Sequence, residues 1–343
     1  MDGNELRFIE DLFSMKWFSK AISGNNFLFV HIPKTAGTSF RISVKNYFQL
    51  NSVFFDYGKS TKTTSSLVKK YVYKLNDCYG LFTKISSKST NLLAGHFPLN
   101  KYIPMYNLKN VICFVREPAQ QLRSHFEHLV RLDGYKKNFI EFIQEPRVIN
   151  FQSRYLRGHP IEAIGFIGLT ESYDKSLEMI NEEYGFSIPV IQLNNNNNKT
   201  SELYELSDEE MELIRDLNQE DYALYNKAKD LFERRIKCKN LGLPFFRGEL
   251  TLRALPKSQR DLSVRGWLLN LASNDIVKGY VLINDQIKVD FEAKDYRPWV
   301  KERIEHRLGY VGFHEKLSNP LKEGDVIKLF DENDLFIDSY IYK

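Results

Sequence analysis

The sequence predicts an α/β fold, a central parallel sheet flanked by helices, followed by a small all-β domain. Continuous apolar runs such as 111–115 are typical of strands buried on both faces of a parallel sheet. Such runs alternate with segments whose apolar residues recur at helical spacing, which is the pattern of parallel α/β proteins. Beyond residue 245 the helical spacing gives way to short strand-like runs separated by turn residues.

In the first part of the chain, expected strands alternate with expected helices. The strands are 27–32, 91–95, 111–115, 164–169 and 188–193. The helices are a short leading helix within 5–20, then 38–48, 67–75, 118–132, 173–184 and a helical region from Ser207 to about 237. We expect loops at 61–66 and at the asparagine run 194–198, and we expect helix 67–75 to cover the site.

The C-terminal part reads as an all-β sandwich. Its expected strands are 250–254, 264–269, 277–283, 287–291, 326–330 and 336–342, with hairpin turns at 284–285 and 332–334. We therefore place one domain at 1–240 and an accessory domain at 245–343. Its aromatic residues, among them Trp267, Trp299 and Phe313, either stack on sugars or form the core of the sandwich, and we favour the core.

Composition narrows the class of protein. The chain has 343 residues, more than one ordinary domain, and is 43% hydrophobic and 27% charged, as globular proteins are. A net charge of +4 suits an anionic ligand but is too small to indicate nucleic acid binding. Cys78, Cys113 and Cys238 show no C-x-x-C pairing, which argues against a disulfide scaffold and a zinc site. We expect no membrane span and no signal peptide.

The most informative segment is 27–39, which reads as a buried strand, a loop of small residues and a helix start. Backbone N–H groups at a helix N-terminus point at an anion, and the helix dipole favours negative charge there. Lys34 adds a cation, while Thr35, Thr38 and Ser39 add hydroxyl groups. The spacing G-x-x-x-x-G-K-[ST] is absent, so this is not a Walker A loop.

A second anion motif follows the strand 111–115. Arg116 stands at the strand end and Ser124 eight residues later in the next helix, so a guanidinium fork and a hydroxyl can converge on one phosphate. His96 directly follows the strand 91–95. Because ligands bind beyond the carboxyl ends of parallel strands, one crevice can collect Lys34, His96 and Arg116.

The run 31–39 resembles the 5′-phosphosulfate loop of carbohydrate sulfotransferases, most of all the Sulfotransfer_2 group that includes the uronosyl 2-O-sulfotransferases. The resemblance implies a P-loop-like sulfotransferase fold and 3′-phosphoadenosine 5′-phosphosulfate (PAPS) as the donor. It implies a carbohydrate or glycolipid acceptor and no metal. We expect no nucleic acid partner, and the oligomeric state stays open.

The resemblance also implies roles for individual residues. Lys34, Thr35, Ala36, Gly37, Thr38 and Ser39 would hold the 5′-phosphate, with Lys34 stabilising the leaving phosphate. Arg116 and Ser124 would bind the 3′-phosphate, and His96 would be the catalytic base. The family usually carries a second arginine where this chain has Gln121, and Arg123 is not carried over to that role. This departure puts part of the 3′-phosphate affinity in doubt.

Looser matches are the segments 150–157, 168–171 and 221–232. Arg154 and Arg157 would face the acceptor or the nucleotide, and a solvent-exposed or structural role is equally open for each. Glu117 is a competing but poorly placed base, and His31 and His125 read as packing or supporting residues.

Two alternative functions remain open at this point: a non-catalytic glycan-binding member of the family and a nucleotide-dependent kinase. Animal members of the family usually carry an N-terminal anchoring helix, which this sequence lacks. We therefore expect a bacterial cytoplasmic enzyme, or a Golgi lumenal one if the sequence is a trimmed eukaryotic chain.

Overall fold

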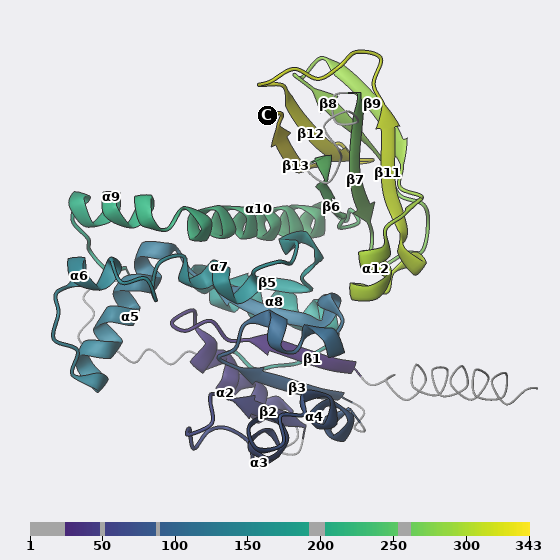
Figure 1. Ribbon diagram of the computed structural model, residues 1–343. Coiled ribbons are helices and arrows are strands. Elements are labelled where there is room, and N and C mark those ends of the chain that lie inside the picture. Colours follow the sequence, from purple (N-terminus) through teal and green to yellow (C-terminus); the bar gives the residue numbers. More distant parts are fainter. Residues whose placement is uncertain (1–24, 49–51, 87–89, 192–202, 253–261) are drawn as a thin grey trace, which may run out of the picture. The chain divides into compact units, whose positions relative to one another are not determined.

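The computed structural model in Figure 1 describes residues 25–48, 52–86, 90–191, 203–252 and 262–343. The chain forms two compact units, the first made of 1–106, 110–157 and 166–226, the second of 107–109, 158–165 and 227–343. The expected division into domains 1–240 and 245–343 stays a prediction. No helix in the described ranges is both long and apolar enough to cross a bilayer.

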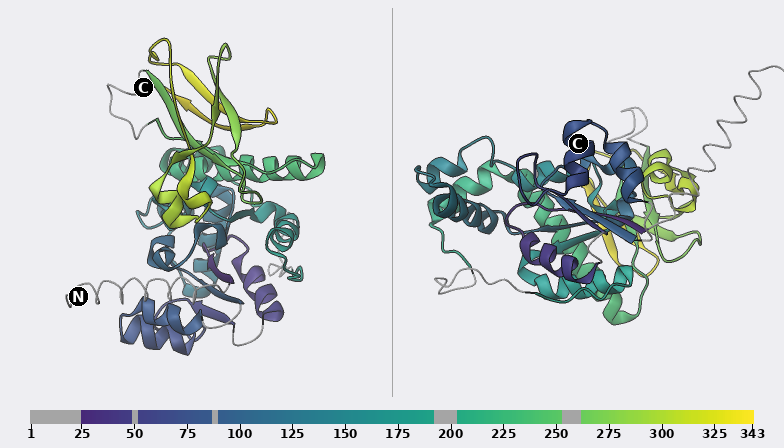
Figure 2. Two further views of the ribbon diagram at one scale, coloured as in Figure 1. Left: turned by 90° about the vertical axis from the view of Figure 1, so that its right-hand side faces the viewer. Right: turned by 90° about the horizontal axis from the view of Figure 1, so that it is seen from below.

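The first unit is built on a five-stranded sheet with the order β2-β3-β1-β4-β5 (Figure 1). All four strand pairs are parallel, as predicted. Helices flank the sheet, which Figure 2 shows from two further directions. The strands are β1 Asn25–Val30, β2 Val53–Asp56, β3 Thr90–Gly95, β4 Val111–Val115 and β5 Phe166–Leu169.

The helices vary widely in length. The longer ones are α2 Gly37–Tyr47, α4 Cys78–Ile85, α5 Pro118–Asp133, α8 Tyr173–Tyr184, α9 Asp208–Leu217 and α10 Gln219–Leu241. The shorter ones are α3 Ser66–Val68, which continues as a π-helical turn Lys69–Lys74, α6 Phe139–Ile143 and α7 Phe151–Leu156. Short 3-10 turns are Leu99–Lys101, Ile103–Met105, Leu108–Asn110, Ile161–Ala163 and Thr170–Ser172.

Aromatic packing fixes α2 on the sheet. Phe29 of β1 and Phe40 of α2 are fully buried, with ring centroids 4.4 Å apart, and Phe114 of β4 lies 5.4 Å from Phe40. Buried aromatic pairs of this kind add to the free energy gained from apolar area. The loop between β1 and α2 is thereby held at the carboxyl edge of the sheet.

Several sequence predictions are confirmed in the first unit. Val111–Val115 and Tyr173–Tyr184 form the expected strand and helix. Ser207 caps α9 in a capping box with Glu210. Strand β2 was missed because its apolar residues stand in a stretch rich in Lys, Ser and Thr. The expected helix within 5–20 and the asparagine run 194–198 lie outside the described residues.

The expected strand 188–193 is wrong over its described part, because residues 188–191 have no regular structure. The side chain of Asn181 on α8 accepts a hydrogen bond from the Ile188 amide and donates one to its carbonyl, both at 2.9 Å. Pro189 has no amide hydrogen and so cannot donate a hydrogen bond to a neighbouring strand. The backbone groups of Ile188 are therefore satisfied by a helix instead of by a neighbouring strand.

The second unit holds two four-stranded sheets, β10-β11-β7-β6 and β13-β12-β8-β9, with antiparallel pairing throughout. This confirms the all-β prediction. The strands are β6 Arg247–Leu250, β7 Ser263–Leu269, β8 Lys278–Ile283, β9 Ile287–Glu292, β10 Asp295–Tyr296, β11 Tyr310–Lys316, β12 Val326–Asp331 and β13 Phe336–Ile341. A helix α12 Pro298–Arg303 and a 3-10 turn Arg307–Gly309 lie between β10 and β11.

One apolar core joins the two sheets of this unit. Phe291 of β9 and Phe313 of β11 stack with ring centroids 3.7 Å apart. Trp267 and Phe313 are fully buried, which confirms that they belong to the core. The expected hairpin turn between β8 and β9 is confirmed by positive φ angles at Asn284 and Asp285.

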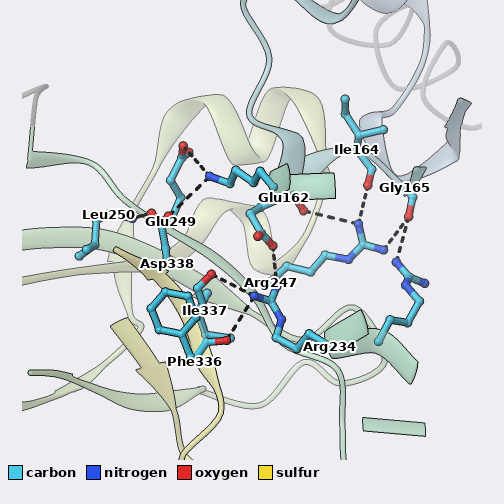
Figure 3. Close-up of polar contacts among 12 residues, drawn as sticks. Glu162, Ile164, Gly165, Arg234, Arg247, Glu249, Leu250, Phe336, Ile337 and Asp338 are labelled. Atoms are coloured by element: carbon cyan, nitrogen blue, oxygen red, sulfur yellow. Dashed lines mark hydrogen bonds and ion pairs between the residues drawn. The ribbon is translucent and has the colours of Figure 1, made fainter. Parts of the chain in front are cut away.

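A network of buried arginines ties the segment 158–165 into the second unit (Figure 3). Arg247 is 2% exposed and donates hydrogen bonds of 2.7 Å to the carbonyls of Ile164 and Gly165. Arg234 pairs with the buried carboxylate of Glu162 at 2.8 Å. The chain just before β5 is therefore held by charge-assisted hydrogen bonds, which are stronger than neutral ones.

We predict that Arg247→Met lowers the free energy of unfolding by about 1 to 3 kcal/mol. The buried carbonyl of Ile164 loses its charged donor, whereas the carbonyl of Gly165 keeps Arg235 at 3.2 Å. Chemical denaturation of the whole chain measures this. Lys301→Met, a change at an exposed position of the same unit, is the matched control. Equal stabilities of the two variants would contradict the prediction.

Candidate functional site

The loop between β1 and α2 has an unusual backbone. Lys34 and Ala36 both lie in the left-handed region, with φ of 70° and 62°, although neither is glycine. Ala36 is the N-cap of α2, and its carbonyl accepts from the Phe40 amide at 3.2 Å. Residues 37–39 form the first turn of α2, and the N–H groups of a helix's first turn point outward along its axis, where an anion can meet them.

Three side-chain donors hold this loop by its carbonyl oxygens. The Thr35 hydroxyl donates to the Ile32 carbonyl at 2.8 Å. Gln121 Nε2 donates to the Pro33 carbonyl at 3.0 Å, and Arg116 Nη1 to the Lys34 carbonyl at 3.4 Å. The last contact brings the two predicted anion motifs together.

Gly37 is required by a close approach of the His31 ring. A Cβ atom at this position would lie 1.9 Å from Cδ2 and 2.0 Å from Nε2 of His31. Such contacts do not occur in proteins, so any side chain here would displace the ring or the loop.

Arg116 stands at the carboxyl end of β4 and is fixed through its backbone. The Gln152 side chain accepts from the Arg116 amide at 3.0 Å and donates to its carbonyl at 2.8 Å. The guanidinium lies 5.8 Å from the ring centroid of Tyr204, and Ser124 is nearly buried on α5. Burial lowers the pKa of Arg116, with Glu171, Tyr204 and Glu117 opposing it.

Gln121, at the position of the family's second arginine, is fully buried and tethers the loop as described above. Arg123 instead pairs with Glu127 at 3.1 Å and Glu210 at 3.7 Å, and its guanidinium lies 4.8 Å from the Phe139 ring. The guanidinium of Arg123 therefore interacts with side chains of α6 and α9, and we leave Arg123 out of the expected 3′-phosphate site.

Glu117, the competing base, is the N-cap of α5. Its carboxylate accepts from the Gln120 amide at 2.8 Å and from the Tyr222 hydroxyl at 2.9 Å. Both carboxylate oxygens thus have structural partners.

His96 follows β3, and its amide donates to the Asp56 carbonyl of β2 at 3.0 Å. Its side chain is exposed to solvent on the surface that the two neighbouring rings leave uncovered. The ring centroids of His31 and Tyr57 lie 4.4 and 4.6 Å away. Since His31 also contacts Gly37, the predicted base lies beside the predicted phosphate loop.

Burial and nearby basic residues set the charge states of Lys34 and His96. Burial, followed by Arg131 and Arg116, lowers the pKa of Lys34 to about 8. Burial by the surrounding protein, followed by Arg41, His125 and His128, lowers the pKa of His96 to about 4. His96 is therefore neutral at pH 7 and able to accept a proton, while the clustered cations attract an anion.

The sequence prediction missed Arg41, Tyr57, His128 and Arg131. A signal for two of them was present, because His128 and Arg131 share with Ser124 one face of α5 at helical spacing. Arg41 lies one turn into α2 after the loop. Tyr57 follows the strand that was not predicted.

The segment 150–157 holds the backbone of Arg116 in place. The Asp221 carboxylate accepts from the amides of Gln152 at 2.9 Å and Ser153 at 2.7 Å, which caps α7. Gln152 in turn holds the backbone of Arg116. This looser sequence match thus has a scaffolding function in the structure.

Arg154 and Arg157 are held by contacts of their own. Arg154 donates to the carbonyls of Asn150 at 3.2 Å and Arg147 at 2.6 Å. Arg157 is exposed and pairs with Glu220 at 3.3 Å. A role toward an acceptor stays a prediction for both.

Within the part of the chain that the structure describes, no cluster of His, Cys, Asp or Glu could hold a metal ion.

Comparisons with known proteins find structural similarity only. No protein-family model matches, and no curated protein matches in sequence. A sulfotransferase from Alicyclobacillus acidocaldarius is 14% identical, with 58% of this chain and 93% of that chain covered and a TM-score of 0.36. The mouse sulfotransferase SULT7A1 complexed with PAP is 10% identical, with 57% and 66% covered and a TM-score of 0.29. These overlaps are too weak to assign a family.

Proposed function

We propose that the protein is a PAPS-dependent sulfotransferase that acts on a hydroxyl group of a carbohydrate or glycolipid. The observation that carries the proposal is the meeting of the two anion motifs, in which Arg116 donates to the carbonyl of Lys34. A donor with phosphates at both its 5′ and 3′ positions needs two anion sites in one crevice. The sequence resemblance of 31–39 to a phosphosulfate loop supports the same donor.

In this proposal the 5′-phosphate lies against the amides of 37–39. The exposed Thr38 offers a hydroxyl there, whereas the Thr35 hydroxyl already donates to Ile32. The 3′-phosphate meets Arg116 and Ser124, since a guanidinium binds two phosphate oxygens at once.

The transfer is in line. The acceptor oxygen forms a bond to sulfur while the bond from sulfur to the phosphate oxygen breaks, and His96 takes the proton of the acceptor hydroxyl. Lys34 and the loop amides stabilise the charge that develops on the leaving phosphate, at about 3 kcal/mol for a well-placed donor. The negative charge of the bound phosphosulfate raises the pKa of His96 and so makes it a stronger base.

The first prediction concerns the donor product 3′-phosphoadenosine 5′-phosphate (PAP). At about 100 times its Kd, PAP should stabilise the protein by roughly 2.7 kcal/mol, measured by thermal unfolding. ADP and 5′-AMP should stabilise it less because they lack the 3′-phosphate. Arg116→Ala should abolish the preference for PAP.

Equal stabilisation by ADP would contradict the proposal and favour a kinase-like site. No shift with any nucleotide would favour a glycan-binding protein without this chemistry.

The second prediction concerns pH. Only protonated Lys34 attracts the phosphates, and its pKa without ligand is about 8. Bound PAP raises that pKa, so PAP affinity should be greatest below about pH 8 and fall as pH rises above it, with proton uptake on binding. Titration calorimetry in buffers of different ionisation enthalpy measures the uptake. In Lys34→Ala binding should be weaker and the uptake above pH 8 should disappear; uptake that persists would exclude Lys34 as its source.

The third prediction concerns the base. His96→Ala should lower kcat by about 10²- to 10⁴-fold, because the acceptor hydroxyl loses its proton acceptor. Sulfuryl transfer to a panel of glycans measures this, and PAP should still stabilise the variant. His314→Ala, at an exposed position of β11, is the control. Near-normal turnover in His96→Ala would show that another group is the base.

A further inference from the structure

His31 is a buried histidine beside the base whose role the proposed reaction leaves open. It is 5% exposed, and its Nδ1 lies 2.8 Å from the Tyr57 hydroxyl oxygen. The ring lies between Phe29, at 5.7 Å and nearly parallel, and His96, at 4.4 Å and steeply inclined. Its Cδ2–Nε2 edge faces Gly37. The ring is therefore held on four sides.

The backbone of His31 adds a further constraint. Its amide donates to the Gly95 carbonyl at 2.9 Å, directly before His96. The main chain of His31 is thus bonded to the end of β3, directly before His96, and the ring of His31 packs against the ring of His96. A movement of His31 would displace both.

The hydrogen-bond chemistry of Tyr57 selects one tautomer of His31. Among the described residues the Tyr57 hydroxyl has one hydrogen-bond partner, Nδ1 of His31, which is thus the acceptor available to its proton. The Arg41 guanidinium lies over the Tyr57 ring instead, 5.4 Å from its centroid. Burial raises the pKa of Tyr57, so the hydroxyl keeps its proton. The hydroxyl therefore donates to Nδ1 of His31, which places the imidazole proton on Nε2.

We propose that His31 is a positioning residue for His96, fixed by Tyr57 as the neutral Nε2–H tautomer and holding the base against the phosphate loop. The part of this inference that concerns turnover rests on the proposed sulfotransferase function. The part that concerns the tautomer and the setting of His96 does not.

The surroundings keep both imidazoles neutral. The groups that face the pair are Lys34 in the loop, Arg41 on α2, Tyr57 after β2, and His125 and His128 on α5. Burial, followed by His96, Arg41 and Lys34, lowers the pKa of His31 well below its usual value. A neutral His31 leaves the proton of the acceptor hydroxyl to His96.

Nitrogen NMR of the histidine-labelled whole chain tests the tautomer directly, with His31→Asn to assign the signals. We expect His31 to be neutral with its proton on Nε2 from pH 5 to 8, and to lose this single tautomer in Tyr57→Phe. The Nδ1–H tautomer in the unaltered protein, or titration of His31 near pH 6.5, would overturn the proposal.

The same spectra report on His96. In Tyr57→Phe the loosened His31 admits water, so the pKa of His96 should rise toward its usual value. An unchanged titration of His96 would overturn the positioning role, whether or not the protein transfers sulfuryl groups.

Turnover supplies the last comparison. Tyr57→Phe should lower kcat by about tenfold to a hundredfold and move the acid limb of the pH profile upward, while KM for PAPS changes by less than about twofold. Tyr106→Phe is the matched control, because the Tyr106 hydroxyl is buried and has no hydrogen-bond partner among the described residues. An unchanged kcat in Tyr57→Phe would overturn the proposal. Absence of turnover in the unaltered protein would overturn the sulfotransferase function, and the NMR result would stand by itself.

Discussion

The left-handed turn at Lys34 and Ala36 is the constraint on which the candidate site depends. A turn of this kind costs free energy for residues with a side chain, so it persists only where neighbours hold it. Carbonyl oxygens would repel an anion, and here those of Pro33 and Lys34 are bonded by Gln121 and Arg116. The amides at the start of α2 are left to face the crevice. The same contacts that stabilise the turn therefore also reduce the repulsion of an anion by its carbonyl oxygens.

Burial and clustered cations lower the pKa of Lys34 and of His96 together. For His96 the effect is useful, because a neutral imidazole is needed in a strongly positive setting. For Lys34 it means that an anionic ligand favours the protonated form and raises the pKa again. Arg41, Arg116 and Arg131 add positive charge around Lys34 and His96, which attracts anions.

The sequence predicted those parts of the structure that depend on local pattern. Val111–Val115 is a run of apolar residues that forms the expected buried strand, and Lys34, His96 and Arg116 each follow a strand of the sheet, as expected. The wrong strand at 188–193 and the missed support by Asp221 have a common cause. Both depend on side chains that reach the backbone of another element, as Asn181 does to Ile188. No periodicity in the sequence records such contacts.

Gln121 shows how a departure from a family pattern can be compatible with the same chemistry. An arginine at this buried position would add a cation near Lys34 and lower the pKa of that lysine further. A neutral amide instead donates to the Pro33 carbonyl and keeps the turn in place without extra charge. In the proposed function, recognition of a 3′-phosphate then depends on Arg116, whose amide and carbonyl are both hydrogen-bonded by the Gln152 side chain. The proposed 3′-phosphate site thus relies on a single arginine, whose backbone and guanidinium are both fixed by hydrogen bonds.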